Sequence, residues 1–182
     1  MKAWRVMLMA LSFLMLNGCL VTFNEAPLVA ETAPRQLLGK WVSKDAWGQA
    51  RNLLISAIDK QHYQAVVYPA GEPKAQERYR FIVARHGSRW YASAALPAKL
   101  GGHYTLSGFE LTDSNELVVY DLDLDQIKQA IGQSALSGDA IETAEGPGAL
   151  INSPSAKVFA YLDDPANSDV FVEAARYQRV VK

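Results

Sequence analysis

Residues 78–94, RYRFIVARHGSRWYASA, contain the pattern that decides the fold. Tyr79, Phe81 and Val83 alternate with more polar neighbours, so a strand here has one apolar face and one largely charged face. The tripeptide His86–Ser88 can turn the chain before a second aromatic-rich segment begins. This stretch therefore predicts an antiparallel hairpin with one buried face.

Segments of the same kind lie on both sides of this hairpin, separated by short stretches of turn residues. Short connections favour antiparallel neighbours. The residues from Val172 to Val181 are apolar enough for a last strand. We expect a mainly β fold (α+β) in which an antiparallel meander forms a small barrel or half-barrel, with short helices near the C-terminus. The expected strands of the meander are Leu37–Ser43, Asn52–Ile58, His62–Tyr68, Arg78–Arg85, Arg89–Ala94, Tyr104–Leu111 and Glu116–Leu122.

Two helices are expected after the meander. Asp123 can cap the first helix, Ile127 and Ile131 belong to its apolar stripe, and Gly132 can end it in a left-handed conformation. Ser153–Pro154 can begin the second helix.

Two segments have no sustained periodicity. Residues 20–35 contain two prolines and are expected to form a tether, so that a single domain spans residues 36–182. Residues 132–153 are rich in Gly, Ser, Ala and Pro and are expected to form a long loop, with at most a brief strand at Ala140–Thr143.

The N-terminus has the features of an export signal. Lys2 and Arg5 precede an apolar run at residues 6–16, and residues 1–18 would be the signal peptide. The run of eleven residues is too short for a transmembrane helix, which needs about 20 residues.

The sequence Leu16-Asn17-Gly18-Cys19 follows this run and resembles the lipobox of bacterial lipoproteins. The resemblance implies a diacylglycerol thioether on Cys19, cleavage after Gly18 and an N-acyl chain, so that residues 19–35 would be a lipidated N-terminus and tether. It also favours the outer membrane, facing the periplasm, because Leu20 stands where an aspartate would resemble an inner-membrane retention signal. Cys19 is the only cysteine in the chain, so no disulfide can form within it. The alternative is that Cys19 is an apolar residue of an uncleaved anchor.

Charge limits the classes of partner. The whole chain has a formal net charge of -1, and without residues 1–18 it keeps sixteen basic and nineteen acidic side chains. This balance provides no electrostatic footprint for nucleic acid, so no nucleic-acid partner is expected. It also provides no polybasic membrane signal, so the acyl chains would have to hold the protein on the membrane.

The segment Gly39-Lys40-Trp41 resembles the Gly-x-Trp opening of lipocalins. In that family the tryptophan of the first strand plugs the closed end of an eight-stranded barrel, and a late arginine packs across it. The resemblance implies that Trp41 is such a plug and that Arg176 or Arg179 is its partner. The alternative is an unrelated β-meander in which Trp41 is an ordinary core residue.

A set of aromatic and basic residues is a candidate binding surface. Aromatic rings can line an apolar pocket, and arginines suit carboxylates or phosphates. The alternatives are core packing for the aromatic residues and a solvated outer face for the arginines. The candidates are Trp47, Trp90, Tyr91, Tyr104, Arg78 and Arg80.

No local motif indicates catalysis or metal binding. We name no catalytic residue and no metal ligand, and we expect no cofactor apart from the acyl chains on Cys19. The first hypothesis is a periplasm-facing, lipid-anchored module that binds an apolar or amphipathic small molecule. The alternative is a non-catalytic interaction or assembly lipoprotein that acts through a protein partner in the envelope.

Overall fold

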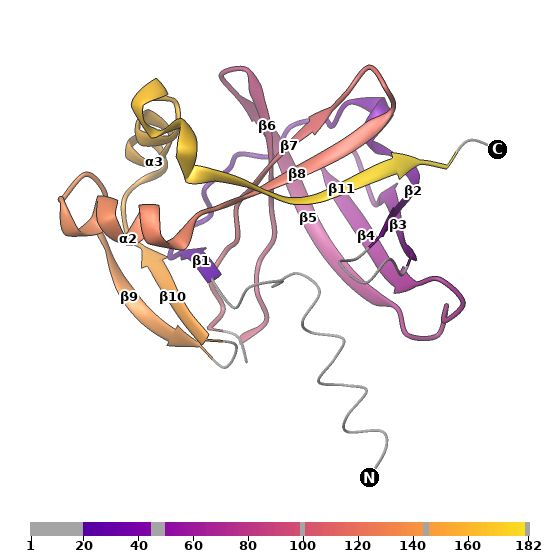
Figure 1. The fold of residues 1–182 in the computed structure, drawn as a ribbon, viewed down its shortest axis with the longest axis horizontal. Helices are drawn as coiled ribbons and strands as arrows, with labels where there is room; N and C mark the ends of the chain where they lie inside the picture. The colour runs from indigo at the N-terminus through magenta and orange to yellow at the C-terminus, as the bar shows by residue number, and fades with distance from the viewer. Residues whose placement is uncertain (1–19, 45–49, 99–100, 144–145, 181–182) are drawn as a thin grey trace, which may run out of the picture.

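The computed structural model describes residues 20–44, 50–98, 101–143 and 146–180. These residues form a closed antiparallel barrel of eight strands in the order β11-β2-β3-β4-β5-β6-β7-β8, with a smaller lobe beside it (Figure 1). The expected β class and meander are confirmed, and the barrel is closed and lipocalin-like in outline. The barrel strands are β2 Gly39–Lys44, β3 Ala50–Ala57, β4 His62–Pro69, β5 Glu77–His86, β6 Arg89–Ser93, β7 Ser107–Leu111, β8 Glu116–Leu122 and β11 Phe171–Arg179.

Alternation along the strands separates the inside of the barrel from the outside. Tyr63 is paired with Phe81 and Ala65 with Tyr79, so all four side chains point to the same side of the sheet. Tyr63 and Phe81 pack inside the barrel with ring centroids 5.7 Å apart. The apolar face expected from the sequence is therefore the interior.

The lobe contains the remaining elements except η2, which lies beside Trp41, and its sheet has the order β1-β10-β9. Strand β1 is parallel to β10, which is antiparallel to β9. Figure 1 shows the lobe beside the barrel, with α2 and α3 at its outer side. The elements outside the barrel are β1 Leu20–Phe23, η2 Arg35–Leu37, α2 Leu124–Gly132, β9 Gly138–Thr143, β10 Gly146–Ile151, α3 Ser155–Leu162 and η4 Pro165–Val170.

The described residues form two hydrophobic cores. One core fills part of the barrel and includes Trp41, Val83 and Phe109. The other lies between the outer wall of the barrel and the lobe, where Tyr91 of β6 meets Phe159 of α3 in an edge-on contact at 5.2 Å. The lobe is therefore packed on the barrel through an apolar interface.

The expected tether at residues 20–35 is wrong. Leu20–Phe23 forms strand β1, and Phe23 is only 2% exposed. Further along, the backbone N–H of Glu31 donates to the Val83 carbonyl at 2.7 Å, and the N–H of Ala33 donates to the Tyr63 hydroxyl at 2.8 Å. This segment therefore runs from the lobe to the barrel as part of the folded domain.

The expected loop at residues 132–153 is also wrong, because it contains the hairpin of β9 and β10. The two helices after the meander do form. Asp123 caps α2 by accepting a hydrogen bond from the Gln126 N–H at 2.9 Å, as expected. Gly132 is the last residue of α2, whereas the left-handed conformation after the helix is adopted by Ser134, at φ 62°.

Candidate functional site

One end of the barrel, here called the Trp41 end, is closed by tight packing. Trp41 is 1% exposed, and its indole Nε1 donates to the Leu37 carbonyl at 3.0 Å. The guanidinium carbon of Arg179 lies 4.4 Å from the centroid of the Trp41 ring, which is a cation–π contact. Gly39 has φ +134°, and a Cβ there would come within 2.9 Å of Arg179 Nη1. Glycine at this position therefore lets the arginine lie across the tryptophan.

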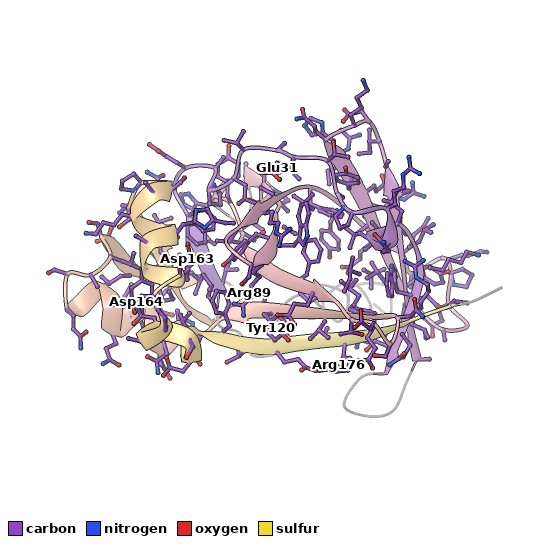
Figure 2. The ribbon with its side chains drawn as sticks, turned by 90° about the horizontal axis from the view of Figure 1, so that it is seen from above. Glu31, Arg89, Tyr120, Asp163, Asp164 and Arg176 are labelled. Atoms are coloured by element: carbon purple, nitrogen blue, oxygen red, sulfur yellow. The ribbon has the colours of Figure 1, made fainter. Side chains whose placement is uncertain are left out.

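The structure distinguishes the two candidate arginines. Arg179 also donates to the Leu38 carbonyl at 3.2 Å, so it ties the end of β11 to the start of β2. Arg176 lies on the outer side of β11 (Figure 2), where it forms ion pairs at 2.8 Å with Glu116 and with Glu173. Arg179, and not Arg176, is the partner of Trp41.

The opposite end, here called the polar end, has ionisable side chains facing the interior. Ser107 begins β7 and Asp121 is near the end of β8, so the antiparallel strands bring both residues to this end. The Ser107 hydroxyl donates to the Asp121 carboxylate at 2.7 Å. Burial raises the pKa of the Asp121 carboxyl, and the hydrogen bond from Ser107 partly opposes this rise. The carboxylate is therefore held in a poorly solvated position.

Tyr177 lies near this carboxylate on the interior face of β11. Burial raises the pKa of the Tyr177 hydroxyl, the positive charge of Arg51 opposes that rise, and the negative charge of Asp121 adds to it. Both charged groups share the interior face, because Arg51 is two residues from the interior Leu53 on β3 and Asp121 is two residues from the interior Val119 on β8. The polar end thus contains both signs of charge within the barrel wall.

A second polar pair lies at the start of β5. Glu77 faces the interior opposite Val67, and Tyr79 does so opposite Ala65. The Tyr79 hydroxyl donates to the Glu77 carboxylate. Burial, with the nearby Glu77 carboxylate, raises the pKa of Tyr79, so this tyrosine is a neutral hydrogen-bonding group at physiological pH.

The barrel wall between the two ends is apolar and partly buried. Ala65, Val67, Ala92 and Val119 all have interior-facing positions and pack against the barrel core, and each residue is only partly buried. Trp90 joins this wall and packs against Phe109 with ring centroids 6.2 Å apart. The wall above the Trp41 end is therefore lined by small apolar residues that are less completely buried than Trp41.

The aromatic candidates are not gathered into one site. Trp90 faces the interior, whereas its neighbour Tyr91 faces outward, is 1% exposed and packs in the core shared with the lobe. Tyr104 pairs through its backbone with Phe23 and packs against the same outer core. Trp47 lies outside the described residues.

The basic candidates lie on the outer wall. Arg78 and Arg80 are exposed on β5, paired with Val66 and Gln64 of β4, so they face away from the interior. Figure 2 shows a different arginine, Arg89, beside Tyr120 on the outside of the barrel, where its guanidinium carbon is 5.3 Å from the ring centroid. Cys19, the candidate lipidation site, lies outside the described residues.

A groove of about 650 Å³ lies in the lobe, between α2, α3 and η4. Its lining includes small residues such as Ala130 and Ala160 and amide side chains such as Gln129 and Gln133. This groove is separate from the barrel interior and was not indicated by any sequence motif.

Neither a metal-binding cluster nor a membrane-spanning helix is present in the part of the chain that the structure describes. In that part of the chain, no three His, Cys, Asp or Glu side chains gather where they could hold a metal ion. Across the same residues, no helix is both long enough and apolar enough to cross a membrane.

The geometry of the barrel is that of an amphipathic interior. The interior has a fully buried end at Trp41, a partly buried apolar wall, and a polar end formed by Arg51, Glu77 and Asp121. No family model matches the chain, and neither a curated protein nor a solved structure matches it.

Proposed function

We propose that this protein is a lipid-anchored lipoprotein of the bacterial envelope whose barrel binds an apolar or amphipathic ligand from the periplasmic side. The observation that carries the binding proposal is the change along the barrel interior, from the apolar Trp41 end to the charged side chains of the polar end. An apolar chain would lie on the wall at Ala65, Val67 and Trp90. Its polar head would meet the charged groups at the polar end.

The anchoring proposal depends on the sequence Leu16-Asn17-Gly18-Cys19 and on the apolar run before it. A thioether-linked diacylglycerol provides two acyl chains, and stable anchoring needs two membrane signals of this kind. The outer membrane is the proposed location because Leu20, rather than an aspartate, follows the cysteine.

Lipidation is tested by metabolic labelling with palmitate in a bacterial host. The full chain should acquire the label and sediment with membranes, and Cys19→Ser should acquire none. A second variant, with residues 1–19 replaced by an ordinary cleavable secretory signal, should appear in the soluble periplasmic fraction. An unlabelled wild-type chain would overturn the anchor.

Ligand binding is tested on that soluble periplasmic form by native mass spectrometry after gentle purification. The test keeps residues 20–35, because they belong to the folded domain. A discrete adduct of lipid-like mass is expected. Ala65→Phe fills the interior and should remove the adduct, whereas Gln64→Phe, on the outer face of the same strand, should retain it. If the adduct survives both changes, the ligand is not held in the barrel.

The groove between α2, α3 and η4 favours a second candidate function, an interaction lipoprotein that holds an envelope protein. Its small and amide-bearing lining residues suit the backbone of a partner's peptide segment, because amides both donate and accept hydrogen bonds. A photo-reactive residue at Gln129 should then cross-link one defined protein in intact cells. The same residue placed at Gln178 on the barrel should not.

A further inference from the structure

The first described strand leaves no room for a flexible linker after Cys19. Leu20 is paired with Gly148, and the Thr22 hydroxyl donates to the Ala149 carbonyl at 3.2 Å. Val21 and Phe23 are 8% and 2% exposed. Because adjacent Cα atoms are about 3.8 Å apart, a lipid on Cys19 would be attached one residue from a buried strand.

Strand β1 lies at the polar end of the barrel. Phe23 exchanges two backbone hydrogen bonds with Tyr104, at 2.8 and 2.9 Å, and Tyr104 is bridged to Ala95. Ala95 comes shortly after Ser93, where β6 ends on the polar side. From Phe23 the chain continues toward the Trp41 end, where Ala33 binds the Tyr63 hydroxyl.

The surrounding turns agree with this placement. In Figure 1 the β4–β5 hairpin, the connection after β6 and the β9–β10 hairpin all reach the lower edge of the molecule. The β5–β6 and β7–β8 turns reach the upper edge. Leu20 pairs with Gly148 close to the tip of the β9–β10 hairpin, so β1 enters from the side of the lower turns.

We propose that the polar end of the barrel faces the bilayer that holds the Cys19 lipid, with Arg51, Glu77 and Asp121 toward the lipid headgroups. This inference rests on the proposed lipidation. Turning the polar end away from the membrane would require Leu20 to leave its partner Gly148 and would expose Val21 and Phe23. The occupant of this surface is therefore the bilayer itself. A ligand with an acyl chain could then pass between bilayer and barrel without crossing bulk water.

The test uses the full lipidated chain in liposomes. Acylated Cys19 is the only native cysteine, so one introduced cysteine can carry a fluorophore. Lys74→Cys places the probe on the exposed β4–β5 hairpin at the polar end, and Ser114→Cys places it on the exposed β7–β8 turn at the other end. Lipids with a spin-labelled headgroup should quench the probe at 74 severalfold more than the probe at 114. Equal quenching, or stronger quenching at 114, would overturn the orientation.

A linker variant separates close attachment from chance contact. Twelve Gly/Ser residues inserted between Cys19 and Leu20 span roughly 20 Å on average, so the difference between the two probes should largely disappear. Palmitate labelling of the same samples decides the anchor separately. A labelled chain with the reverse quenching pattern refutes only the orientation, whereas an unlabelled chain refutes the lipid anchor.

Discussion

Arg179→Met should destabilise the barrel far more than the same replacement at Arg176. The Arg179 guanidinium lies over the buried Trp41 ring and donates to two backbone carbonyls. A cation–π contact of this kind is worth up to about 2 kcal/mol. Hydrogen bonds from a charged group add to it, so we expect a loss of about 2 to 3 kcal/mol once partial exposure is allowed for. Arg176 is an exposed partner of Glu116 and Glu173, and water screens both ion pairs.

The assay is urea unfolding followed by far-UV circular dichroism. Tryptophan fluorescence is less suitable, because the Arg179 change alters the surroundings of Trp41 directly. With an unchanged slope against urea, a lower midpoint reports lost stability. A loss of about 2 to 3 kcal/mol is a large share of the 5–15 kcal/mol typical of a domain. The midpoint of Arg176→Met should stay close to that of the wild type.

A double-mutant cycle with Trp41→Phe shows whether the stacking itself is responsible. Residues in contact couple by about 0.5 to 3 kcal/mol, so Arg179 and Trp41 should show such a coupling. Arg176 and Trp41 should show none. Equal losses at the two arginines, or additive effects of Arg179 and Trp41, would refute this account of the Trp41 end.

Three further predictions concern a buried carboxyl, a pair of glycines and the first strand. Asp121→Asn should raise the free energy of unfolding at pH 7 and lose this advantage at pH 3, as measured by urea unfolding at both values. The reason is that burial raises the pKa of this carboxyl in the folded state. The energetic penalty for burying its charge is therefore absent below the pKa of the unfolded state and is complete once the pH exceeds the pKa of the folded state. Lower stability of Asp121→Asn than of the wild type at pH 7 would contradict this argument. Gly138→Ala should cost about 1 to 3 kcal/mol because the new Cβ would lie 2.5 Å from the Leu150 carbonyl oxygen, whereas Gly132→Ala, with no atom within 4 Å of its Cβ, should be neutral or slightly stabilising. Deleting residues 20–23 should lower the melting temperature of the soluble domain, and an unchanged melting temperature would restore the interpretation of this segment as a tether.

The meander was predictable because its information is local. The alternation of Tyr79, Phe81 and Val83 indicates the inner face of strand β5. The pairing of β4 with β5 follows from their short connection. The alternation of side chains between the two faces of a strand could also have located the polar end. Arg51 is two residues from Leu53, and Asp121 is two residues from Val119, so each charge lies on an interior-facing register.

The lobe was not predictable from composition because its sheet demands residues that are typical of loops. A Cβ on Gly148 would lie 2.7 Å from the Leu20 carbonyl oxygen, and one on Gly138 would meet Leu150. Glycine is needed where these backbones approach closely, and it weakens the strand signal at the same positions. The described aromatic candidates are separated for a different reason. Trp90 and Tyr91 are adjacent in one strand, so they necessarily face opposite sides of the barrel wall.

The N-terminal segment connects the two hydrophobic cores. Val21 and Phe23 are buried in the core between lobe and barrel, while Ala33 and Leu37 are buried in the barrel core beside Trp41. Because one continuous segment contributes to both cores, loss of either core removes contacts from the other, which favours cooperative unfolding of lobe and barrel. A lipid on Cys19 would therefore be attached directly before the segment that joins both cores.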